Sequence, residues 1–363
     1  MTGCSTEHTG IESYSLEFEQ SEWENQKLDE NVVANFKVES ENVSSAFVYE
    51  CKEIAISIEG IREAFFYSDT SKIEYSKHYE SPDEPKFGYV YSGISQAGLK
   101  ITSNYRGSRG STNEAEMYRH FLGYAPEGWG TDGKPKQLGT TEELLFLEKN
   151  AIEMEITEGL NKLIPYVELE DINFYTLSAD YLNEIQNLTL ENIKKYNDPN
   201  WYAEEKEYEK DWKYEEGAYY VTVGMSMDGI AVKEYLNDML VDERRLGGYK
   251  AIFIYNKNGC VYADLPMYLE IKFSREEPII SVSQALQALK EDITSVILTN
   301  ENVIEDAKLQ YVLVYVSSST ELEILPMWVF EGKVLIETNK GDFGVMEVYE
   351  SYFVNAITGE VLH

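Results

Sequence analysis

The chain ends with ESYFVNAITGEVLH, residues 350–363, and this stretch decides the fold expected for its last part. The apolar run Tyr352-Phe353-Val354 leads into Asn355, and Gly359 follows shortly after. An asparagine side chain can hydrogen-bond the backbone two residues on, and glycine adopts the positive φ that a tight turn needs. The stretch therefore predicts a strand, a turn and a second strand.

Upstream of this ending, the sequence predicts one helix and two further strands. Ser281 and Gln284 form a capping-box pattern, which marks the start of a helix. Apolar residues follow at the spacing of one helix face, namely Val282, Ala285, Leu286, Leu289 and Ile293. The apolar runs at 311–316 and 325–330 then predict strands, so the expected order is helix, strand, strand, strand.

This order, closing on Asn355-Ala356-Ile357-Thr358-Gly359, resembles the PepSY-type module of extracytoplasmic bacterial proteins. It is also similar to the last domain of the YycH/YycI-type membrane-anchored regulators of Gram-positive bacteria. In those regulators a Pro-x-Trp strand, here Pro326-Met327-Trp328, precedes a strand of the same kind. The resemblance implies a module that binds or restrains other proteins and catalyses nothing.

The rest of the chain divides into segments with different patterns. Short strand-like runs alternate with turns in the first third. In the middle a Thr140-x-x-Glu143 capping box begins a helix with an apolar face of Leu145, Ile152, Ile156 and Leu163. The expected parts are a tether at 1–31, an N-terminal β-rich domain at 32–138, a middle PepSY-like domain at 139–275 and a C-terminal PepSY-like domain at 276–363. We therefore predict an α+β fold, with antiparallel sheets each packed by amphipathic helices and two PepSY-like units in tandem.

The charge of the chain excludes several kinds of partner. The 363 residues include 31 Lys and Arg against 65 Asp and Glu, which gives a net charge of −34. Nucleic-acid binding depends on neutralising phosphates with basic side chains, and binding to anionic lipid headgroups needs basic patches. The sequence therefore predicts no nucleic-acid partner, and membrane association only through a lipid anchor.

The N-terminus supplies a candidate for that anchor. Met1-Thr2-Gly3-Cys4 resembles the end of a lipobox, in which the cysteine after a small residue and glycine is lipidated. We therefore expect Cys4 to carry a lipid and the chain to be extracytoplasmic at the cell membrane. The other cysteines, Cys51 and Cys260, are expected to be buried free thiols, and a disulfide between them is the alternative.

No motif in the sequence points to catalysis, a metal or a cofactor. The histidines, His8, His78, His120 and His363, form no metal-binding pattern. The stretch 224–228, Gly-Met-Ser-Met-Asp, lacks the final glycine of a nucleophile elbow and is expected to be a strand that turns at Asp228-Gly229. We predict a protein that is not an enzyme, with no catalytic residues, no metal and no cofactor.

Aromatic residues provide the candidate binding site. Tyr208 and Trp212 are four positions apart and are expected to share a helix face, with Trp201 nearby and Trp129 in a glycine-rich loop. Two interpretations stay open. The rings either pack onto the sheet of the middle domain or form a platform for a partner or a sugar.

These observations favour one function and leave two alternatives. The favoured function is a non-catalytic cell-envelope lipoprotein that acts as a protein-interaction or regulatory module outside the membrane. The first alternative is a carbohydrate- or peptide-binding surface protein that uses the tryptophans. The second is a hydrolase that uses a pair of its many carboxylates.

Overall fold

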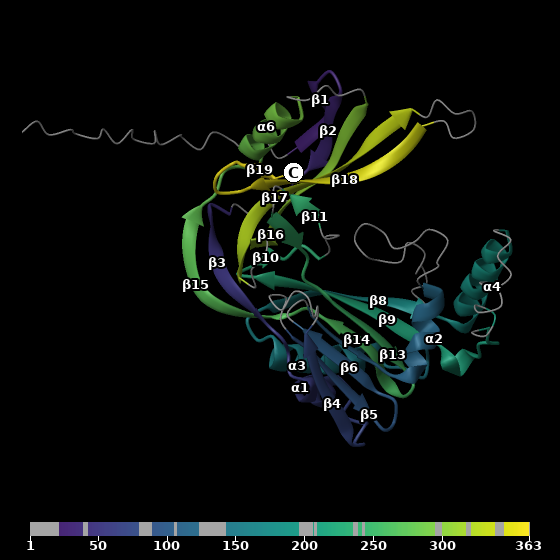
Figure 1. Ribbon diagram of the computed structural model, residues 1–363. Coiled ribbons are helices and arrows are strands. Elements are labelled where there is room, and N and C mark those ends of the chain that lie inside the picture. The colour runs from purple at the N-terminus through teal and green to yellow at the C-terminus, as the bar shows by residue number, and fades with distance from the viewer. Residues whose placement is uncertain are drawn as a thin grey trace, which may run out of the picture.

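Two large β-sheets build the molecule, as the computed structural model shows (Figure 1). The structure describes residues 22–38, 43–79, 89–104, 107–122, 143–195, 206, 209–234, 239–241, 244–294, 300–316, 321–337 and 345–362. The two sheets form separate lobes, and a long curved pair of strands runs along one side between them (Figure 1).

Sheet A has ten strands and contains the C-terminal part of the chain. Its main path is β1 (Glu22–Asp29), β2 (Val32–Lys37), β16 (Glu301–Val316), β17 (Glu321–Glu337), β18 (Val345–Asn355) and β19 (Val361–Leu362). Off this path lie β3 (Ser45–Ile54), which pairs with β17 and β15 (Tyr268–Pro278), and β12 (Arg244–Gly247), which pairs with β16 and β11 (Met239–Val241). The pairings are antiparallel except that of β2 with β16.

Sheet B has nine strands and forms the other lobe. Its path is β10 (Ile230–Ala231), β9 (Ala218–Met227), β13 (Ala251–Asn256), β14 (Gly259–Leu265), β7 (Gly107–Ser111), β6 (Lys100–Asn104), β5 (Tyr89–Ser95) and β4 (Ile73–Tyr79). On its other side β9 pairs with β8 (Glu168–Leu177). β4 therefore ends the sheet.

Helices cover parts of both sheets. In the described residues they are α1 (Ile58–Phe65), α2 (Asn113–Leu122), α3 (Lys149–Leu163), α4 (Ala179–Lys195), α6 (Val282–Ile293) and the short 3-10 helix η2 (Tyr214–Glu216). α1 and α3 share a core with Val221 of β9, whereas α2 and α4 share another with Tyr220. Because neighbouring residues of a strand point to opposite faces, the two helix pairs lie on opposite faces of sheet B.

The local predictions for the C-terminal unit are confirmed. α6 begins after Ser281, whose hydroxyl accepts from the backbone N–H of Gln284 at 3.2 Å. The side chain of Asn355 accepts from the backbone N–H of Ile357 at 2.9 Å, and Gly359 has a φ of 75°. Another tight turn of this kind joins β13 and β14 at residues 256–259, where Gly259 has a φ of 100°.

The predicted fold class is wrong, because the molecule is mostly β and its sheets extend well beyond the helices. The largest core cluster combines Val221 and Phe253 of sheet B with Leu313 and Ile324 of sheet A. One core therefore runs through both sheets, whereas separate units of helix on sheet would each have a core of their own. All ten residues of β9 are buried, which a strand with one open face cannot achieve.

The predicted parts of the chain do not correspond to separate sheets. β3 comes from the segment expected to be the N-terminal domain, but it pairs with β15 and β17 of sheet A. β4 to β7 come from the same segment and lie in sheet B. Tandem PepSY-like units, each with its own sheet, are therefore absent from the described topology.

Two predicted boundaries also differ from the structure. Residues 22–29 of the expected tether form β1, where the side chain of Trp23 is 3% exposed and stacks on Phe36 with ring centroids 4.7 Å apart. The middle helix, α3, begins at Lys149 rather than after Thr140, which lies outside the described residues. Leu145, expected on its buried face, is 89% exposed.

Buried tyrosines predict a steep loss of stability in alkaline solution. Burial raises the pKa of Tyr118, of Tyr181 and of Tyr311 to about 12 in each case, from a usual value of about 10. The folded state therefore holds these protons more tightly than the unfolded chain. Their stabilising contribution is complete below about pH 10 and is lost as the pH rises through about 12.

We expect the urea midpoint of unfolding, followed by circular dichroism, to fall steeply between these two pH values. The part of the tyrosinate absorbance that belongs to the buried rings should rise together with unfolding rather than before it. Titration of all tyrosines near pH 10 in a protein that stays folded would contradict the assignment.

Candidate functional site

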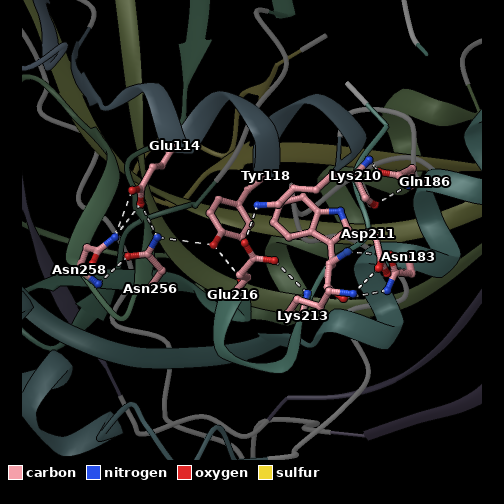
Figure 2. Close-up of polar contacts among 11 residues, drawn as sticks. Glu114, Tyr118, Asn183, Gln186, Lys210, Asp211, Lys213, Glu216, Asn256 and Asn258 are labelled. Atoms are coloured by element: carbon pink, nitrogen blue, oxygen red, sulfur yellow. Dashed lines mark hydrogen bonds and ion pairs between the residues drawn. The ribbon is translucent and has the colours of Figure 1, made fainter. Parts of the chain in front are cut away.

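The residues around Trp212 form a dense polar network at the end of sheet B covered by α2 and α4 (Figure 2). Asn183 of α4 accepts from the backbone N–H of Trp212 at 3.1 Å and donates to its carbonyl at 3.3 Å. Gln186 makes the same two bonds with the backbone of Lys210, each at 2.9 Å. The two amides thus bind alternate residues of the segment 209–213 and fix it to α4.

This fixation places the ring of Trp212 inside the protein. The side chain is 3% exposed, and its ring centroid lies 5.1 Å from that of Tyr118. The ammonium of Lys210 lies 4.3 Å from the ring centroid and also pairs with Glu216 at 3.0 Å. The indole N–H has no hydrogen-bond partner among the described residues.

The network continues to the turn between β13 and β14. The hydroxyl of Tyr118 donates to the carbonyl of Glu216 at 2.7 Å. On the same helix, Glu114 accepts from Asn256 at 2.8 Å and from Asn258 at 3.1 Å. α2 is therefore tied near its start to the hairpin turn and at its middle to η2, and the network holds this part of the fold together.

Of the predicted binding residues, the structure describes one. Cys4, Trp129, Trp201 and Tyr208 lie outside the described residues. Trp212 lies before η2 and not in a helix, so the helix face expected to join it to Tyr208 is absent there. Because its ring is buried, Trp212 agrees with the interpretation that the rings pack inside the protein, and not with a binding platform for a partner or a sugar.

The residues considered for nucleophilic chemistry are buried and poorly reactive. Ser226 lies within β9 and is 2% exposed, and the turn at Asp228-Gly229 has φ values of 49° and 74°, as predicted. Cys51 and Cys260 are free thiols, also as predicted. Burial raises the pKa of Cys51 to about 12 and that of Cys260 well above its usual value, so neither forms a thiolate near neutral pH.

Glu155 of α3 is a half-buried carboxylate. Burial raises the pKa of Glu155, and the hydroxyls of Tyr255 and Tyr67 donate to its two oxygens at 3.0 and 3.2 Å. Its partners are therefore phenols, whereas a glycosidase needs a second carboxylate. The described residues contain no group of three His, Cys, Asp or Glu side chains that could hold a metal ion.

An exposed group of tyrosines lies at the other end of sheet B. Tyr75 of β4 is 60% exposed, and Tyr89 and Tyr91 of β5 are each 37% exposed. Lys77 is paired with Tyr91 across the two strands, and Tyr75 with Gly93, so these side chains share one face. We call Tyr75, Lys77, Tyr89 and Tyr91 the tyrosine surface.

Polar contacts orient the side chains of the tyrosine surface. The ammonium of Lys77 lies 3.6 Å from the ring centroid of Tyr89 and 5.1 Å from that of Tyr91. The hydroxyl of Tyr75 donates to Glu59 of α1 at 2.7 Å. Sequence reasoning missed this surface, although tyrosine and lysine alternate at positions 75, 77 and 79, the period of a strand face.

Comparison with known proteins establishes a fold but no family. No protein-family model and no curated protein matches the chain. A solved structure of an uncharacterized protein from Eubacterium rectale is similar over 92% of this chain and 91% of its own, with a TM-score of 0.62 and 13% identity. At this identity the two proteins share the two-sheet fold alone. No helix in the described part of the chain is long and apolar enough to span a bilayer.

Proposed function

We propose that this chain is a non-catalytic binding module of the cell envelope that engages a protein partner through the tyrosine surface. The exposed rings of Tyr75, Tyr89 and Tyr91 on one sheet face carry the proposal. Tyrosine is enriched at protein interfaces because a rigid ring covers a large apolar area at a small entropic cost, and its hydroxyl still forms hydrogen bonds.

The arrangement of these side chains supports binding more than packing. β4 is exposed at every residue from Glu74 to His78, so neither of its faces is covered there. Lys77 and Glu59 supply charge beside the rings, and their contacts hold the rings in place before a partner arrives.

A glycan is the second candidate ligand for the same surface. Exposed aromatic rings with hydrogen-bonding groups beside them also suit sugars, whose apolar faces stack on rings. Lys77 and Glu59 are such groups. The two candidates differ in what destroys binding, which is protease treatment for a protein and glycosidase treatment for a glycan.

We expect a Tyr75→Ser, Tyr89→Ser, Tyr91→Ser variant to lose most of its binding to bacterial envelope fractions and to keep its melting temperature. Three exposed rings that each contribute about 1 kcal/mol or more would weaken binding at least about a hundredfold. The matched control is Tyr67→Ser, Tyr349→Ser, which removes rings that are 61% and 55% exposed elsewhere. Equal binding by both variants would contradict the proposed function.

The location of the protein is a separate part of the proposal and rests on Met1-Thr2-Gly3-Cys4. We expect the full gene product to fractionate with membranes and a Cys4→Ala variant to appear in the medium. Equal release of the two forms would remove the lipid anchor from the proposal and leave the tyrosine surface unaffected.

A further inference from the structure

The free edge of β4 presents an unpaired strand backbone beside the tyrosine surface. β4 pairs with β5 in an uninterrupted antiparallel register from Ile73 to Tyr79. On its other side no strand of the described residues pairs with it. In an antiparallel strand alternate backbone groups face the neighbouring strand, so the others point away from β5 along this edge.

Other edge strands of the molecule carry features that discourage further pairing. β1 has two register shifts, β8 has one between Leu169 and Ile172, and β15 has one between Ile271 and Phe273. β15 also carries the ion pairs of Lys272 with Glu270 and of Arg275 with Glu277, and it ends at Pro278. Bulges, charges and proline are the means by which proteins protect sheet edges.

β4 has neither a bulge nor a proline, and its lysine side chain does not block the pairing of another strand. The ammonium of Lys77 lies over the rings of Tyr89 and Tyr91 on β5, away from the open side of β4. The hydroxyl of Tyr75 is likewise held by Glu59 of α1. Both contacts draw the long side chains of this face toward the sheet and leave the backbone edge accessible.

We propose that an extended peptide of basic character adds to sheet B as a further strand along β4. This inference rests on the proposed function and specifies how the same surface engages its partner. Strand addition obtains affinity from main-chain hydrogen bonds and specificity from alternate side chains. One set of peptide side chains passes beside Tyr75, and the other passes beside Glu74, Ser76 and His78.

The negative charge of the protein is the reason for expecting a basic peptide. The chain has a net charge of −34, so its field attracts basic segments and repels acidic ones. Close to the edge, Glu74 is exposed on the face opposite the tyrosines, and the side chain of Glu59 is 42% exposed beside Tyr75. Glu59 already pairs with Arg62, so Glu74 is the carboxylate that a lysine in the added strand can approach.

The test uses the full chain and an octapeptide of alternating threonine and lysine, with alternating threonine and glutamate as control. We expect the lysine peptide to bind and to slow amide hydrogen exchange within residues 73–79, since the outward N–H groups of β4 become bonded. Binding should weaken as salt is added. Failure of the lysine peptide to bind, or binding without protection of β4, would overturn the proposal.

Proline variants separate strand addition from contact with the rings. Neighbouring N–H groups of β4 point in opposite directions. Of the two variants Ser76→Pro and Lys77→Pro, one therefore removes an N–H that points to the open edge, and the other removes an N–H that bonds to β5 and so destabilises the sheet. The variant that keeps the parent melting temperature should bind the lysine peptide about tenfold more weakly than the alanine variant at the same position, which loses the same side chain but keeps the N–H. Unchanged binding by that variant would refute strand addition, whereas the serine variants of the tyrosine surface decide the proposed function independently.

Discussion

Replacing Trp328 by alanine is expected to lower the free energy of unfolding by about 3–5 kcal/mol. Trp328 lies on β17, is 6% exposed and packs in one core cluster with Val282, Leu286 and Leu289 of α6. Its indole N–H donates to the carbonyl of Ile280 at 2.9 Å. The substitution therefore removes a large ring from between helix and sheet and leaves the part-buried carbonyl of Ile280 without its donor.

Urea unfolding followed by circular dichroism measures this loss. Val329→Ala is a matched control on the same strand, because it removes a smaller buried side chain, 1% exposed, from another core cluster and should cost less. A Trp328→Ala protein that unfolds at the parent urea concentration would show that α6 does not depend on this ring.

The C-terminal unit could be predicted because the signals that specify it are local. The capping box of Ser281 and Gln284 and the turn at Asn355 both follow from short patterns in adjoining segments. Nothing comparable links β3 to its partners. β3 pairs with β15 and β17, which are more than two hundred positions away, and no local period tells which distant strand it joins.

The candidate site was less predictable, because exposure depends on where other elements end. Tyr75 and Ile73 share a face of β4, yet Ile73 is 6% exposed and Tyr75 is 60% exposed. α1 accounts for the difference, since a Cβ on Gly93 would lie 2.8 Å from Ile58 and 2.9 Å from Ile73. The helix packs closely at that point, and the tyrosines beyond it are uncovered. A sequence pattern gives the face of a strand but not the length over which a helix covers it.

Trp212 is a second position at which truncation should cost about 3–5 kcal/mol of stability. Its ring is 3% exposed and contacts Tyr118, and its backbone is bound by Asn183 on both sides. Trp212→Ala therefore opens a cavity beneath α4 while the amide of Asn183 keeps its backbone partners. The same urea titration measures the cost, and a loss below about 1 kcal/mol would mean that the cluster repacks without the ring.

Phenylalanine at the same two positions isolates the indole N–H. Trp328→Phe and Trp212→Phe delete the same atoms from buried rings, so their loss of apolar contacts is similar. Trp328→Phe also deprives the carbonyl of Ile280 of its donor, whereas the N–H of Trp212 has no partner among the described residues. Removing a buried donor without a partner relieves a desolvation penalty, and removing a bonded one creates such a penalty. We therefore expect Trp328→Phe to cost about 1–3 kcal/mol more than Trp212→Phe. Equal costs would show that the indole of Trp212 donates to a partner, and the segment 209–213 would then be held by more than the two amides of α4.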